Sequence, residues 1–101
     1  MNVNHGFHAT MTAQPGQGDK LVEFLLDAPS LTDPDCVVFL VSRSATDPDI
    51  VSVTEGWVSR EAHGSFFATD AAQRLVADLR SLLAGEPEYT DSVPVGGKPA
   101  F

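Results

Sequence analysis

The segment at residues 36–45 limits the possible folds most strongly, because it is apolar on both faces of the strand that its composition predicts. Two sets of apolar residues alternate along it, namely Val37, Phe39 and Val41, and Cys36, Val38 and Leu40. A strand that is buried on both faces of a sheet has this pattern. The turn at residues 46–49 and a second β-rich run at residues 50–58 follow, which predicts a hairpin.

The rest of the chain predicts the order β-α-β-β-α-β. Strands have a hydrophobic period of two and helices one of 3.6, and on this basis we expect further strands and helices at residues 6–13, 19–28, 60–67, 70–84 and 89–95. Ser59 and Asp70 are the expected N-caps of the last two helices. This order is that of a ferredoxin-like α+β sandwich, in which helices cover one face of an antiparallel sheet.

Composition limits the functions that the chain can have. The 101 residues are 43% hydrophobic and 20% charged, so we expect one globular domain at residues 1–101. The net charge of −8 repels phosphate backbones and anionic lipid, which argues against nucleic-acid and membrane partners. The start of the chain has no basic and apolar leader, and the single cysteine cannot form an internal disulfide. We therefore expect a cytoplasmic protein.

The second face of the sheet predicts self-association. The helices can cover only one side of the apolar strand at residues 36–45, and the chain has no further element to cover the other side. A soluble monomer rarely exposes an apolar patch of that size. We therefore expect a homodimer with its sheets packed face to face.

The hairpin register decides which residues face the helices. A four-residue loop at residues 46–49 would place Ser42 opposite Val53, Leu40 opposite Glu55 and Val38 opposite Trp57. Val53, Glu55 and Trp57 would then share one face with Ser42, and this face would line a pocket if it met the helices. A slip of one residue would reverse every face.

The stretch Glu55-Gly56-Trp57-Val58-Ser59-Arg60-Glu61-Ala62-His63 resembles the antibiotic biosynthesis monooxygenase domains. Pro15-Gly16, Asp33-Pro34-Asp35-Cys36 and Pro94-Val95-Gly96-Gly97 agree with that family. The resemblance implies a dimeric α+β barrel with a pocket for a small-molecule substrate in each subunit. It also implies the oxidation of polycyclic phenols to quinones by dioxygen, with no flavin, haem or metal as cofactor. Other members degrade haem or rearrange small signalling molecules.

Three residues depart from the family's active patterns. Quinone-forming members of the family have an asparagine at the position that Val53 occupies in this sequence. Haem-degrading members have a histidine at the position of Phe67. Many relatives have a histidine at the position of Phe66. Three functions therefore remain open, in this order: a cofactor-independent monooxygenase acting on a small aromatic or polyketide-like substrate, a non-catalytic binding dimer, and a haem-binding or haem-degrading protein.

The candidate catalytic residues are His63, Trp57 and Glu55. His63 can take a phenolic proton, because its ordinary pKa lies near neutrality. Trp57 can offer its indole N–H to a substrate oxygen, or it can be a core side chain. Glu55 is an acid within an apolar strand, where burial would raise its pKa. It could equally be a structural acceptor paired with an arginine or with helix N–H groups, and His63 could be a surface residue.

The candidate substrate-binding residues are Val53, Ser42, Phe66, Phe67 and His8. His8 lies on the opposite face of its strand from Phe7, so it could point either into the pocket or into the dimer interface. The three histidines lack the spacing of metal ligands, and Cys36 has no second cysteine beside it, so we expect no metal site.

Overall fold

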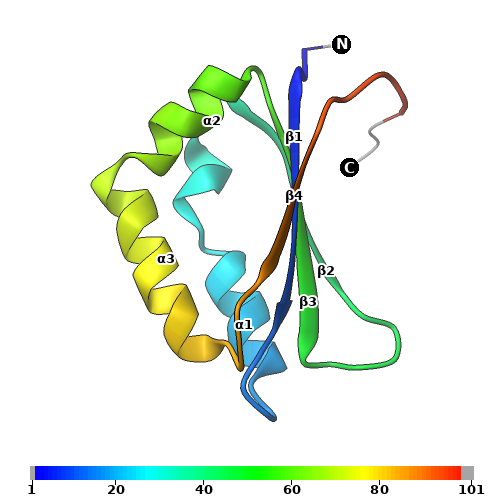
Figure 1. The fold of residues 1–101 in the computed structure, drawn as a ribbon, viewed down its shortest axis with the longest axis vertical. Helices are drawn as coiled ribbons and strands as arrows, with labels where there is room; N and C mark the ends of the chain where they lie inside the picture. The colour runs from blue at the N-terminus through cyan, green and yellow to red at the C-terminus, as the bar shows by residue number, and fades with distance from the viewer. Residues whose placement is uncertain (1, 99–101) are drawn as a thin grey trace.

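The computed structural model describes residues 2–98 and has a four-stranded antiparallel sheet with helices along one face (Figure 1). Its elements are β1 (His5–Thr12), α1 (Gly18–Leu25), the 3₁₀ helix η1 (Pro29–Thr32), β2 (Cys36–Arg43), β3 (Ile50–Trp57), α2 (Arg60–Phe67), α3 (Asp70–Leu82) and β4 (Glu88–Ser92). The strand order is β2-β3-β1-β4. This confirms the ferredoxin-like α+β fold, and the unexpected addition is η1, which follows α1 and begins at Pro29.

The two helices that follow β3 begin at side-chain caps. The Ala62 backbone N–H donates to Ser59 Oγ over 3.0 Å, which confirms the expected cap of α2. The cap of α3 is Thr69, whose Oγ1 accepts from the Ala72 backbone N–H over 3.2 Å. The prediction of Asp70 as the N-cap is therefore wrong, since Asp70 is the first residue inside the helix. Its carboxylate lies in the first turn, where it complements the helix dipole.

The register of the hairpin between β2 and β3 differs by one residue from the expected one. Ser42 lies opposite Ser52, not opposite Val53, and Phe39 lies opposite Glu55. A shift of one residue exchanges the two faces of a strand. Phe39 therefore faces the helices, and Ser42 lies on the opposite face of the sheet.

The loop of this hairpin explains the shift. The Ser44 backbone N–H donates to the Ile50 carbonyl, so the loop contains five residues and not four. Within it, Ser44 Oγ accepts hydrogen bonds from the backbone N–H groups of Thr46 and Asp47. Asp47 Oδ1 in turn accepts from the Asp49 backbone N–H over 2.9 Å. Short polar side chains thus stabilise a longer turn than the Asp-Pro-Asp sequence predicted.

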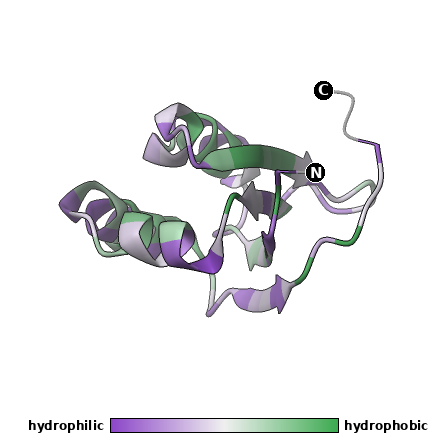
Figure 2. Cartoon of the chain, turned by 90° about the horizontal axis from the view of Figure 1, so that it is seen from above, coloured by the Kyte–Doolittle hydropathy of each residue, from purple (hydrophilic) through white to green (hydrophobic). Residues whose placement is uncertain are grey.

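The core lies between the sheet and the helices. Strands β1 and β3 contribute alternate residues to it and the helices contribute their apolar stripes, as their periodicities require. The most buried members are Ala9, Met11, Ala13, Leu21, Leu25, Val51 and Val53. The two edges of the sheet differ in character, since β2 is apolar and β4 is polar and exposed along its whole length (Figure 2).

No helix of the described residues 2–98 covers the other face of the sheet. His8 and Thr54 are exposed there, and so is the side chain of Leu40. The chain beyond β4 passes along this side (Figure 1), where a Cβ on Gly6 would collide with the side chain of Ser92. No helix within residues 2–98 has the length and apolar character needed to cross a membrane.

Candidate functional site

A cavity of about 70 Å³ lies between the sheet and the helices. Its walls are mostly apolar and include Phe39 and Val53 of the sheet, Phe66 and Phe67 of α2, and Leu75 and Leu79 of α3. Glu55, His63 and Tyr89 also line it and bring titratable groups to an otherwise apolar space. An apolar cavity with a few convergent polar groups is the usual form of a small-molecule site.

Glu55 and Trp57 form the rigid part of this site. They lie two residues apart on β3, so their side chains share the face toward the helices. The indole Nε1–H of Trp57 donates to Glu55 Oε1 over 2.9 Å. Trp57 is 0% exposed, and the Glu55 side chain is 12% exposed. Burial raises the pKa of Glu55, and the hydrogen bond from Trp57 opposes that rise in part.

His63 projects from α2 onto these two residues. Its ring centroid lies 5.0 Å from that of Trp57, and its side chain is 13% exposed, so it is not a surface residue. Burial lowers the pKa of His63, as does the neighbouring His5, while Asp91 acts in the opposite direction. The neutral imidazole is therefore favoured. His63 Nε2 lies 3.9 Å from Glu55 Oε1, which is too long for a hydrogen bond but close enough for charge attraction.

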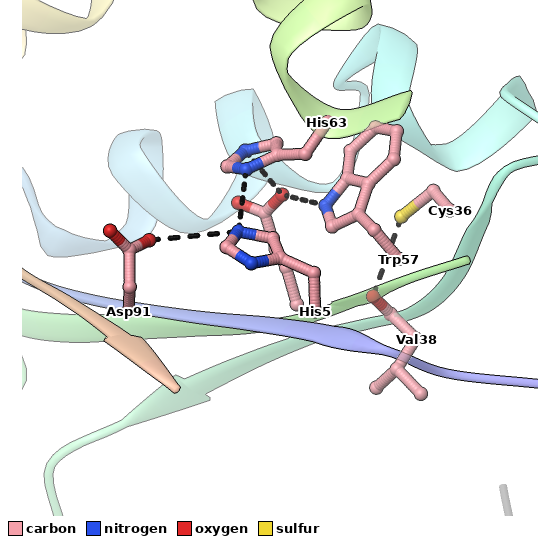
Figure 3. Close-up of polar contacts among 7 residues, drawn as sticks. His5, Cys36, Val38, Trp57, His63 and Asp91 are labelled. Atoms are coloured by element: carbon pink, nitrogen blue, oxygen red, sulfur yellow. Dashed lines mark hydrogen bonds and ion pairs between the residues drawn. The ribbon is translucent and has the colours of Figure 1, made fainter. Parts of the chain in front are cut away.

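His5 and Asp91 extend the contacts from His63 toward the surface. His5 Nε2 lies 3.1 Å from His63 Nδ1 and 3.6 Å from Asp91 Oδ1. His5 is buried on β1, whereas Asp91 is exposed on β4. Figure 3 shows the resulting chain of side chains from Asp91 through His5 and His63 to the carboxylate beside Trp57. Four elements thus supply one polar cluster beside an apolar cavity.

Sequence reasoning did not select His5 or Asp91 as site residues. His5 continues the alternation that places Phe7 and Ala9 on the helix-facing side, and β1 begins at His5 where the prediction began one residue later. Its periodicity could therefore have identified it. Asp91 carries no such signal, because only the pairing of β4 with β1, which sets Asp91 opposite Phe7, brings it to the cluster.

Two of the expected catalytic residues and three of the expected substrate-binding residues line the cavity. They are Glu55 and His63, and Val53, Phe66 and Phe67. Trp57 lies beside the cavity but not on its wall, and its indole N–H is already bonded to the carboxylate. The expected role of that N–H as a donor to a substrate oxygen is therefore not available in this arrangement.

Ser42 and His8 lie away from the cavity. The observed register puts Ser42 on the uncovered face of the sheet, which corrects the expectation that it faces the pocket. His8 lies on the same uncovered face, where its Nδ1 is 3.0 Å from Thr54 Oγ1. Of the two directions left open for His8, the structure therefore selects the one away from the pocket.

Two further groups bear on the chemistry. The Cys36 thiol donates weakly to the Val38 carbonyl over 3.4 Å, and burial raises the pKa of Cys36 to about 12, so it stays a thiol. Thiolates, not thiols, are the nucleophiles and metal ligands. Within residues 2–98, His, Cys, Asp and Glu side chains form no group of three that could hold a metal ion.

Comparisons with known proteins agree with this architecture. The sequence profile of the family described as antibiotic biosynthesis monooxygenase matches residues 5–78. No curated protein matches the chain. Among solved structures, a candidate antibiotic biosynthesis monooxygenase from Chloroflexus aurantiacus is 35% identical, with a TM-score of 0.82, over 94% of this chain and 96% of that one.

Two more distant structures show the same fold. A candidate antibiotic biosynthesis monooxygenase from Caulobacter crescentus is 24% identical, with a TM-score of 0.81, over 94% of this chain and 93% of that one. A protein of unknown function from Nitrosomonas europaea is 18% identical, with a TM-score of 0.82, over 99% of this chain and 98% of that one. At these identities the likeness concerns architecture and not activity.

Proposed function

Because the chain belongs to the antibiotic biosynthesis monooxygenase family, we propose that it is a cofactor-independent monooxygenase. Its substrate would be a small phenol of the aromatic or polyketide-like class, and its oxidant dioxygen. The observation that supports this proposal most directly is the pair formed by Glu55 and His63 at the wall of an apolar cavity. The pair can take a proton, and the cavity can admit an apolar gas.

Removal of the phenolic proton is the step that the protein must perform. The neutral His63 imidazole is the form that accepts a proton, and its lowered pKa keeps it in that form. Proton transfer to His63 Nε2 makes an imidazolium 3.9 Å from the Glu55 carboxylate. Opposite charges in a cavity of low polarity attract strongly, so Glu55 stabilises the product of this transfer.

Dioxygen then reacts with the phenolate. One electron passes from the phenolate to dioxygen, and the aryloxyl radical and superoxide combine at the ring carbon opposite the oxygen. The peroxide anion then expels its outer oxygen, together with the hydrogen of that carbon, as hydroxide, which gives the quinone. One atom of dioxygen enters the product and the other leaves as hydroxide, which the phenolic proton converts to water, so a phenol and dioxygen become a quinone and water.

The size of the cavity restricts the substrate. Its volume is about 70 Å³, whereas pockets for drug-sized ligands hold about 300 to 1,000 Å³. A one-ring phenol is the best match to this shape, and a polycyclic one needs Phe67 to move. Phe67 is 44% exposed at the edge of the cavity, so it can turn outward with little loss of packing. A tetrapyrrole would require α2 to separate from the sheet, which makes haem the least favoured ligand.

The test is incubation of the protein with a panel of one-ring and polycyclic phenols, with and without dioxygen. Oxygen uptake and quinone absorbance should rise with the native protein and fall with His63→Gln, while His8→Gln on the uncovered face should match the native rate. Saturable binding of a phenol with no oxygen-dependent product would instead favour the non-catalytic binding protein. Absence of both from the whole panel would remove the proposal.

A homodimer that packs its uncovered sheet faces together completes the proposed molecule. Leu40 of β2 is exposed although it is large and apolar, and no helix within residues 2–98 covers its side of the sheet (Figure 1). Burial of such residues favours association. Sedimentation at micromolar concentration should give twice the mass of 10.7 kDa, and Leu40→Asp should reduce it to one chain. A native monomer would contradict this part of the proposal.

A further inference from the structure

A second hollow lies directly outside the site, on the surface. It is an open groove of about 500 Å³, and His5, Arg60, His63, Gln73 and Asp91 are among its lining residues. His63 lines both this groove and the inner cavity. One imidazole therefore touches the enclosed cavity on one side and the open groove on the other.

The two nitrogens of His63 serve these two sides. Nε2 is the nitrogen near Glu55, which lines the inner cavity, and Nδ1 is the nitrogen near His5, which lines the groove. The same His5 nitrogen that contacts His63 also lies 3.6 Å from Asp91 Oδ1. Figure 3 shows the contacts as one continuous line that ends at the exposed carboxylate.

We propose that His5 is a proton-relay residue, which carries the proton that His63 takes from the substrate out to Asp91 and to the water of the groove. This inference rests on the proposed function, because a relay is needed only if the substrate is deprotonated in the cavity. His5 touches neither the cavity nor the substrate and acts through His63.

The relay can be written atom by atom. In the resting state His63 carries its hydrogen on Nδ1 and donates it to His5 Nε2, which leaves His63 Nε2 free to act as a base. When Nε2 gains the substrate proton, the Nδ1 proton moves over the 3.1 Å contact to His5 Nε2. His63 is neutral again, and the new charge on His5 faces the Asp91 carboxylate. The proton then passes to Asp91 or to water. His63 is left with its hydrogen on Nε2, and proton exchange with the water of the groove, which His63 lines, returns that hydrogen to Nδ1 before the next cycle.

The charges around the cluster favour this direction. Glu55 on β3 attracts a proton toward the cavity, whereas Asp91 on β4 attracts it toward the surface. Arg60 on α2 lines the groove and disfavours a lasting positive charge on His5. The inner cavity offers mostly apolar walls, where a proton cannot be solvated. Tyr89 also lines the cavity, but burial raises its pKa, so it keeps its own proton.

The deciding variant is His5→Gln, whose amide can replace the hydrogen bond to His63 but cannot pass on a proton. We expect kcat to fall about 100-fold, at the lower end of the range for acid–base effects, with KM unchanged. Imidazole added to the buffer should restore part of the rate, because the groove of about 500 Å³ has room for it. His8→Gln, a second β1 histidine on the opposite face, is the matched control and should behave as the native protein.

A measurement without substrate separates the relay from the proposed function. Heteronuclear NMR of the imidazole nitrogens at neutral pH should find the hydrogen of His63 on Nδ1 and none on His5 Nε2. The reverse assignment would overturn the relay even if the protein oxidises phenols. An active native protein whose His5→Gln variant keeps its kcat would also overturn it. A native protein inactive on every phenol would refute the proposed function and leave the relay to be judged by the NMR assignment.

Discussion

Replacement of Glu55 by alanine tests whether the buried hydrogen bond to Trp57 holds the site together. The variant removes the acceptor that lies 2.9 Å from the indole nitrogen, and Trp57 is 0% exposed, so bulk water cannot replace it. An unsatisfied buried donor costs about 1–3 kcal/mol, and the lost buried methylene costs about 0.8 kcal/mol more. Together they predict a loss of roughly 2–4 kcal/mol in the free energy of unfolding.

The reference for this loss is Glu55→Gln, because its amide oxygen can still accept the indole hydrogen bond. The raised pKa of Glu55 means that the folded state holds the proton more tightly than the unfolded state. The stability that this tighter proton binding contributes is fully present below the pKa that Glu55 has in the unfolded chain. It is lost as the pH rises through the pKa that Glu55 has in the folded chain. The native protein should therefore lose stability relative to Glu55→Gln over that interval, and at neutral pH the glutamine variant should be at least as stable.

The assay is urea unfolding followed by tryptophan fluorescence, since Trp57 is the single tryptophan of the chain and reports directly on the site. The alanine and glutamine variants are compared at neutral pH and below the ordinary pKa of a glutamate. If the two variants differ by less than about 0.5 kcal/mol, within the usual range of surface substitutions, the indole hydrogen bond does not stabilise the fold. In that case the assignment of Glu55 as the group that holds Trp57 is wrong.

Three further outcomes are expected. His5→Gln should raise the pKa of His63, because the neighbouring imidazole lowers it; NMR titration that finds no change would contradict the coupling. Phe67→Ala should lower KM for polycyclic phenols more than for one-ring phenols, and equal effects on both would mean that this ring does not limit entry. Thr69→Ala should cost about 1 kcal/mol of stability in thermal unfolding, and Asp70→Ala less; the reverse order would restore Asp70 as the cap.

The hairpin shows where local sequence reasoning fails. Its two strands are evident from their alternation, but the loop between them is one residue longer than Asp-Pro-Asp suggests, because Ser44 bonds to the turn. That single residue moves Ser42 from the expected pocket to the uncovered face. Register depends on the sum of small turn energies, and alternation alone cannot distinguish two registers that differ by one.

Local order along the chain was enough to determine the strands and the α-helices and their sequence, because periodicity and turn chemistry act between near neighbours. It was also enough to place Glu55 and Trp57 side by side, since residues two apart on a strand share a face. Only the tertiary structure decided that His63, His5 and Asp91 meet there, from α2, β1 and β4. Such a meeting depends on strand pairing and helix packing between segments that are 58 residues apart for His5 and His63 and further apart for His5 and Asp91, and no local pattern encodes those contacts.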